Sequence, residues 1–235
     1  MYAALIPVRG GSKSIPLKNV KEFCGKPLVY WTVKAANECK KIDKVYVSTD
    51  SKVIRETVKG FGFEKVEVIG RSGKNATDTA STESVMAEFA YNYQFDNLIL
   101  IQATSPLLMR EDLEKGIELF EQPGVDSVLS SVRQKRFCWK ERDGYSHPVN
   151  YDFNHRPRRQ EFDGYLVENG AFYIISKPLF LATNCRLAGN IKTVEMSEDT
   201  YYEIDEPSDW IIMEELMKRR QKKLSQNKIP PIKLF

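Results

Sequence analysis

The first twenty residues combine glycines, small hydroxyls and cations in a pattern that suits phosphate binding. A short apolar run over residues 3–8 predicts a buried strand leading into Arg9-Gly10-Gly11-Ser12-Lys13, with Lys18-Asn19 close behind. Glycines let backbone N–H groups approach an anion closely, and cations add charge where the first strand of an α/β sheet ends. We interpret this segment as a nucleotide phosphate site. The alternative is an ordinary strand-to-turn connection with solvated charges.

Two carboxylates near the C-terminus form the acidic counterpart of this loop. If Glu203-Ile204-Asp205 is extended, the two-residue period of a strand puts both carboxylates on one face. Mg²⁺ prefers oxygen ligands and binds through one or two carboxylates plus substrate phosphates, so Glu203 and Asp205 are candidate metal ligands. The alternative is a helix N-terminus, where acidic side chains are also favourable.

Two further polar groups are candidates for substrate binding. Gln102 follows the most apolar predicted strand and is placed to recognise substrate hydroxyls, although the same residues also suit a strand-terminating turn. Arg158-Arg159-Gln160 can clamp a carboxylate or form a solvated basic patch. The chain has two histidines and no Ser-His-Asp or Cys-His arrangement, so nucleophilic catalysis has little support.

The elements that must position these groups alternate between strand and helix. Strands are predicted over residues 3–8, 44–48, 65–69, 97–102, 126–132, 168–176 and 193–196. Helices are predicted over residues 27–40, 52–59, 78–93, 110–121 and 208–223. This alternation predicts an α/β fold with a doubly wound, mostly parallel, Rossmann-like sheet covered on both faces.

One segment interrupts the alternation. Residues 133–165 are polar, aromatic and without clear periodicity, which predicts a lid, an arm that reaches a partner subunit, or disorder. Their many aromatic side chains argue against disorder. We therefore expect a single domain over residues 1–225, with residues 133–167 as an inserted segment and residues 226–235 as a polar tail.

The composition excludes several functional classes. The 235 residues include 35 basic and 32 acidic side chains, a balance too even to predict nucleic-acid or membrane binding by bulk charge. The four cysteines are scattered and form no C-x-x-C pair, which argues against a zinc site or a disulfide framework. We expect a cytoplasmic protein, because no signal peptide and no membrane-length apolar run is visible.

Several motifs together resemble the CMP-sialic acid synthetases, or N-acylneuraminate cytidylyltransferases. They occur in family order and are most similar to the animal-like branch, which includes CMP-KDN synthetases, KDN being the deaminated analogue of N-acetylneuraminate. The motifs are RGGSK at 9–13, IPLKN at 15–19, VSTD at 47–50, DTAST at 78–82, IQATSP at 101–106, RPRRQ at 156–160 and ENG at 168–170.

The resemblance implies a nucleotidyltransferase fold and a reaction of CTP with a nine-carbon α-keto acid sugar, with Mg²⁺, to give a CMP-sugar and pyrophosphate. Candidate sugars are KDN and N-acetylneuraminate. The alternatives are legionaminic or pseudaminic acid, or a non-catalytic nucleotide-binding homologue. The resemblance also implies a homodimer, or a dimer of dimers, in which an arm around Arg158, Arg159 and Gln160 enters the partner's site.

The resemblance assigns roles to individual residues. Arg9, Gly11, Ser12 and Lys18 would hold the triphosphate, Asn19 would lie near the α-phosphate and ribose, Ala80 and Thr82 would line the cytosine pocket, and Gln102, Asn169 and Tyr173 would face the sugar. The family usually carries Asp-x-Asp where this chain has Glu203-Ile204-Asp205. Asp205 is therefore the stronger candidate for the metal ligand.

Overall fold

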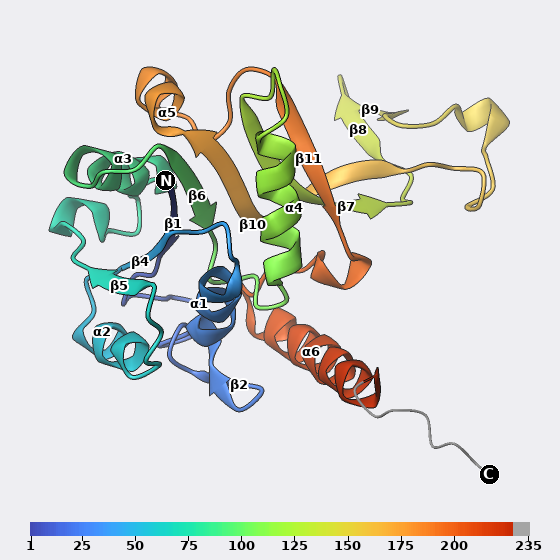
Figure 1. Ribbon diagram of the computed structural model, residues 1–235. Helices are drawn as coiled ribbons and strands as arrows, with labels where there is room; N and C mark the ends of the chain where they lie inside the picture. The colour runs from blue at the N-terminus through green and yellow to red at the C-terminus, as the bar shows by residue number, and fades with distance from the viewer. Residues whose placement is uncertain (228–235) are drawn as a thin grey trace, which may run out of the picture.

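A seven-stranded sheet forms the centre of the structure, a computed structural model that describes residues 1–227 (Figure 1). The strand order is β11-β7-β10-β6-β1-β4-β5. These strands span β1 (Tyr2–Pro7), β4 (Lys44–Ser48), β5 (Val66–Ile69), β6 (Asn97–Ile101), β7 (Ser127–Gln134), β10 (Tyr165–Ser176) and β11 (Ile191–Met196). All pairings are parallel except those that β10 makes with β6 and β7. The predicted doubly wound, mostly parallel sheet is confirmed.

Helices cover both faces of this sheet. One face carries α1 (Leu28–Glu38), α2 (Lys52–Lys59) and α4 (Arg110–Phe120), and the other carries α3 (Thr82–Asn92) and α5 (Lys177–Thr183). Each group buries its apolar stripe against the aliphatic side chains of the strands. The long helix α6 (Pro207–Asn227) packs on a separate apolar cluster that includes Ile15 and Phe23. Helix α6 thereby closes over the segment that follows β1.

Helix boundaries follow the local capping residues. Ser51 begins α2 by accepting a hydrogen bond from Ile54 N at 3.4 Å, and Gly60 ends it. The predicted helix over residues 78–93 is wrong at its start, because α3 begins only at Thr82. Ser81 accepts a hydrogen bond from Ser84 N at 3.1 Å and so caps the helix four residues later than expected.

Strand β10 is irregular where it passes the loop after β6. Its register against β7 shifts between Glu168 and Tyr173, and Gly170 in this interval has a φ of +67°. Phe172 N compensates by donating to Ser130 Oγ at 3.0 Å. A bulge of this kind re-aims side chains. The Glu168-Asn169-Gly170 motif therefore lies where β10 forms this bulge.

The segment after β7 forms an arm that projects away from the sheet (Figure 1). It contains the hairpin β8 (Trp139–Arg142) and β9 (Tyr145–Pro148), then the 3₁₀ turn η2 (Phe153–His155). The turn residues Asp143 and Gly144 both have positive φ, as an Asp-Gly hairpin turn requires. The prediction of irregular structure over residues 133–165 is thus wrong in part. The Asp-Gly pair was the available signal for the hairpin.

Smaller elements complete the described chain. Strands β2 (Glu22–Phe23) and β3 (Lys26–Pro27) form a short ribbon, and the 3₁₀ turns η1 (Gly73–Asn75) and η3 (Glu198–Thr200) lie in loops. The predicted tail over residues 226–235 contributes its first two residues to α6, and the rest lies outside the described residues. Among residues 1–227, no helix combines the length and apolarity needed to cross a membrane.

Candidate nucleotide site

A cavity of about 290 Å³ opens at the carboxyl ends of the central strands. It is lined by residues that follow β1, β5 and β6, whose carboxyl ends share one edge of the sheet. In open α/β sheets this edge is where ligands bind. The predicted site residues that line it are Arg9, Gly11, Ser12, Lys18, Asn19, Ala80, Thr82 and Gln102. The structure therefore brings together eight candidates taken from three separate stretches of sequence.

Lys18 is more enclosed than Arg9 in this cavity. Its side chain is 12% exposed, and its Nζ donates to the Ile204 carbonyl at 2.7 Å and contacts Asp205 Oδ1 at 3.1 Å. These bonds tie the loop after β1 to the segment that precedes α6. Asn19 is also buried, and its Nδ2 donates to the Arg9 carbonyl at 3.4 Å, which helps to shape the loop.

Arg9 and Lys13 share one carboxylate. Arg9 forms an ion pair with Asp78, and Lys13 Nζ lies 2.8 Å from the other oxygen of the same group. Hydrogen bonds from Lys13 and Arg9 lower the pKa of the Asp78 carboxyl below its usual value. Because Arg9 and Lys13 together hold one carboxylate, the same two cations are placed to bind an anionic phosphate.

The two glycines of the loop differ in role. Gly11 lines the cavity and has open space around it. Gly10 does not line the cavity, and its N–H donates to Asp50 Oδ1 at 2.8 Å. A Cβ at Gly10 would lie 2.9 Å from the Cβ of Ser51, so glycine permits a close approach to the cap of α2.

Arg71 is a cavity residue that the sequence interpretation missed. It follows β5, is half-buried, and lines the cavity together with Arg9. Burial lowers the pKa of its guanidinium, and the nearby positive charge of Arg9 lowers it further. The available signal was its place directly after a predicted strand, because parallel strands end at the same edge of the sheet.

Glu203 and Asp205 lie beside the cavity. Thr104, which lines it, donates to Glu203 Oε2 at 3.4 Å, and Asp205 contacts Lys18. Burial raises the pKa of the Glu203 carboxyl, and the charge of Asp205 raises it further, so the two carboxylates are close enough to repel. Gly170 makes room for Glu203, because a side chain there would collide with its carboxylate.

The two carboxylates Glu203 and Asp205 suit Mg²⁺ better than they suit a metal ion whose ligands all come from the protein. Across residues 1–227, no group of three His, Cys, Asp or Glu side chains lies close enough to hold an ion. Mg²⁺ characteristically uses one or two carboxylates and completes its shell with water and substrate phosphates. Asp205 and Glu203 match that donor set beside a cavity rich in cations.

The other predicted sugar ligands do not line the cavity. Asn169 is buried, and its Nδ2 donates to the carbonyl and the hydroxyl of Thr200 at 3.1 and 3.2 Å. Tyr173 donates to Glu168, and burial and this bond raise the pKa of its hydroxyl well above the usual value. Arg186 lies 5.1 Å from the Tyr173 ring centroid. Both predicted ligands therefore have partners within the chain.

Arg158, Arg159 and Gln160 lie on the exposed arm and not at the cavity of the same chain. Their predicted role requires a second chain. Arg156 of the same motif stacks within the arm instead, with its guanidinium 4.4 Å from the Phe137 ring centroid.

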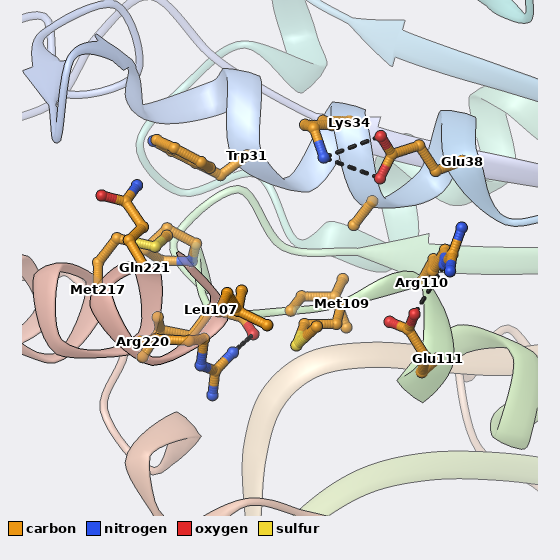
Figure 2. Close-up of a pocket in the computed structure, with 14 residues that line it drawn as sticks. Trp31, Lys34, Glu38, Leu107, Met109, Arg110, Glu111, Met217, Arg220 and Gln221 are labelled. Atoms are coloured by element: carbon orange, nitrogen blue, oxygen red, sulfur yellow. Dashed lines mark hydrogen bonds and ion pairs between the residues drawn. The ribbon is translucent and has the colours of Figure 1, made fainter. Parts of the chain in front are cut away.

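A second cavity, of about 320 Å³, lies between α1, α6 and the start of α4 (Figure 2). Its centre is apolar, with Leu107, Met109 and Met217, and ion pairs occur among its charged side chains. Lys34 pairs with Glu38, and Arg110 with Glu111, as the dashed lines in Figure 2 mark. An apolar centre suits a triphosphate less well than the polar lining of the first cavity does, so this second cavity is the poorer candidate for a nucleotide.

The fold and the cation-lined cavity are those of an α/β protein with a candidate nucleotide site. A family model described as cytidylyltransferase matches residues 3–229, and the chain belongs to this family. The chain is 40% identical over 224 residues to the N-acylneuraminate cytidylyltransferase of Oncorhynchus mykiss, and 30% identical over 216 residues to that of Streptococcus agalactiae. These alignments cover 92% and 88% of this chain and 50% and 51% of the relatives, so the chain spans about half their length.

Solved structures share the fold. A CMP:2-keto-3-deoxy-manno-octonic acid synthetase complexed with CTP superposes with a TM-score of 0.71 at 21% identity, covering 93% of this chain and 99% of the other. A 4-diphosphocytidyl-2C-methyl-D-erythritol synthase from Anaerococcus prevotii gives 0.69 at 14% identity, with 93% and 96% covered. The resemblance drawn from the motifs and the fold it implied are both confirmed.

Proposed function

We propose that this chain transfers the cytidylyl group of CTP to a nonulosonic acid, with KDN or N-acetylneuraminate as the substrate. The observation that carries the proposal is the single cavity in which Arg9, Lys18 and Arg71 meet Gln102. Three cations suit a triphosphate, and a neutral amide suits the hydroxyls of a sugar. The N-acylneuraminate cytidylyltransferases among its relatives support the same substrate class.

In the proposed reaction, the anomeric hydroxyl oxygen attacks the α-phosphorus in line. The new P–O bond joins the sugar to CMP, and the bond from the α-phosphorus to the α–β bridging oxygen breaks. Pyrophosphate leaves with that oxygen, and the hydroxyl proton passes to solvent. Such transfers depend on positioning and on charge stabilisation, without a covalent intermediate. Arg9, Lys18 and the N–H groups around Gly11 and Ser12 bind and orient the triphosphate.

Asp205 and Glu203 are the residues we propose to hold Mg²⁺. When bound, the ion neutralises phosphate charge during phosphoryl transfer. Asn19 is proposed near the α-phosphate and ribose, and Ala80 and Thr82 are proposed to line the base pocket.

We also propose a homodimer in which the arm of one chain, with Arg158, Arg159 and Gln160, completes the partner's site. The exposure of these residues and their distance from their own cavity support this arrangement.

The test is pyrophosphate release from CTP and Mg²⁺ with KDN, N-acetylneuraminate, legionaminate, pseudaminate or 3-deoxy-manno-octulosonate. We expect release with KDN or N-acetylneuraminate, and its loss in Asp205→Ala. Release only with legionaminate or pseudaminate would favour that alternative. CTP binding with no release for any sugar would contradict the proposal and favour a non-catalytic homologue.

A further inference from the structure

The segment over residues 70–81, between β5 and α3, carries much of one wall of the nucleotide cavity. It contributes Arg71, Thr77, Asp78 and Ala80, and Thr82 follows at the start of α3. The segment contains only the short turn η1 as regular structure. Hydrogen bonds from outside it must therefore fix its shape.

Glu88 of α3 supplies those bonds. Its carboxylate accepts from Ser72 N at 2.9 Å and from Ser72 Oγ at 2.8 Å, and it also accepts from Asn75 Nδ2. Burial opposes the charged form of Glu88, but the hydrogen bonds from Asn75 and Ser72 hold its pKa below the usual value. The carboxylate is therefore ionised at neutral pH and satisfied by the segment alone.

Asn75 connects this carboxylate to the cavity. Asn75 is buried, and its Nδ2 also donates to the Ser84 backbone carbonyl at 3.2 Å. The backbone carbonyl of Asn75 accepts from Arg71 Nε at 2.6 Å. Within residues 1–227, the terminal nitrogens of Arg71 donate no hydrogen bond. They remain available to an anion. Asp50 attracts the Arg71 guanidinium and Arg9 repels it, and the hydrogen bond to Asn75 fixes its position between these charges.

We propose that Glu88 is a positioning residue of the nucleotide site, which fixes Ser72 and Asn75 and thereby holds Arg71 beside Arg9. Glu88 does not line the nucleotide cavity, so it acts through these neighbours. The inference rests on the proposed function, because Arg71 gains a ligand only if CTP binds in this cavity.

The test is calorimetric titration of CTP into the wild type, Glu88→Gln and the matched control Glu56→Gln, an exposed position on α2. A glutamine amide nitrogen donates, so it cannot replace the carboxylate oxygen that accepts from Asn75. We expect CTP to bind about tenfold more weakly to Glu88→Gln and unchanged to the control. In turnover, KM for CTP rises while KM for the sugar does not.

A double mutant identifies the route of the effect. If Glu88 acts through Arg71, the double mutant Arg71→Ala/Glu88→Gln binds CTP as weakly as Arg71→Ala alone. If the fold-loss of CTP affinity in the double mutant equals the product of the two single losses, the proposal is overturned. Wild-type affinity in Glu88→Gln would also overturn it. Should Glu88→Gln fail to fold, Ser72→Ala removes one hydrogen bond and is expected to weaken CTP binding less, but measurably; no change would overturn the inference. If the wild type itself binds no CTP, it is the proposed function that fails.

Discussion

At the scale of single residues, the proposed site depends on cations that are held by acidic or carbonyl partners before a substrate arrives. Lys18 contacts Ile204 and Asp205, and Arg9 contacts Asp78. Preformed contacts of this kind reduce the reorganisation needed when phosphate charge enters the site.

Lys18→Ala is expected to lower kcat/KM for CTP by roughly 100-fold, because it removes an enclosed positive charge from the phosphate site. Steady-state kinetics measures the change, with Lys40→Ala, an exposed position in the turn after α1, as the matched control. An activity within twofold of the wild type would remove Lys18 from the site.

Asp205→Asn is expected to raise the Mg²⁺ concentration for half-maximal rate by at least about tenfold, since a neutral amide is a poorer Mg²⁺ ligand. Glu203→Asp tests the departure from Asp-x-Asp. It keeps the charge and shortens the side chain, so we expect a smaller effect on the same Mg²⁺ titration. If Asp205→Asn leaves the Mg²⁺ dependence unchanged, the metal assignment is wrong.

At the scale of elements, the site depends on the bulge in β10 and on contacts between helices. Gly170 makes the bulge possible and leaves room for Glu203. Glu83 at the start of α3 pairs at 2.6 Å with Arg186, which follows α5. Both features join segments that are distant in sequence.

Gly170→Ala is expected to lower the free energy of unfolding by about 1–3 kcal/mol, because a positive φ and a collision with Glu203 both disfavour a side chain. Gly25→Ala is the matched control, since Gly25 has a φ of +80° but open space around it. Urea denaturation compares the two, and the larger loss belongs to Gly170→Ala. Equal losses would show that contact with Glu203 is unimportant.

The Glu83–Arg186 pair predicts a pH-dependent stability. The hydrogen bond from Arg186 lowers the pKa of the Glu83 carboxyl, so its stabilisation is full above the unfolded pKa of about 4.3 and is lost as pH falls through the lower folded pKa. Glu83→Gln is therefore expected to be less stable than the wild type by about 1–2 kcal/mol at neutral pH. The difference should shrink at about pH 3, and a constant difference in urea denaturation would contradict this.

Local signals predicted the elements better than they predicted the site. The bounds of β4 and α2 are as expected, because Ser51, Gly60 and the β-branched strand act within a few residues. The position of β10 between β6 and β7, and the meeting of Arg71 with Arg9, depend instead on strand order across the sheet. Glu88 likewise contacts Ser72 and Asn75 only because residues 70–81 fold back against α3.

At the scale of the whole molecule, contacts within a single chain do not explain why the arm exposes large apolar side chains. Large apolar side chains are exposed along it, among them Trp139 and Phe153, at 51% and 60%. Exposed apolar groups gathered on one projection are typical of an interaction surface. This supports the proposed dimer.

Sedimentation is expected to show a dimer for the wild type, and Trp139→Glu/Phe153→Glu is expected to shift it to monomer with lower activity. The matched control is Tyr91→Glu, which changes a still more exposed aromatic residue on α3, away from the arm. A monomeric wild type with full activity would contradict the arm's proposed role.

The central claim is cytidylyl transfer from CTP to a nonulosonic acid. The most direct measurement is ³¹P NMR of the wild type with CTP, Mg²⁺ and KDN or N-acetylneuraminate. We expect one phosphodiester signal from the CMP-sugar for each pyrophosphate formed, and neither product in Asp205→Ala. Formation of CDP and inorganic phosphate, or no change in CTP with either sugar, would contradict it.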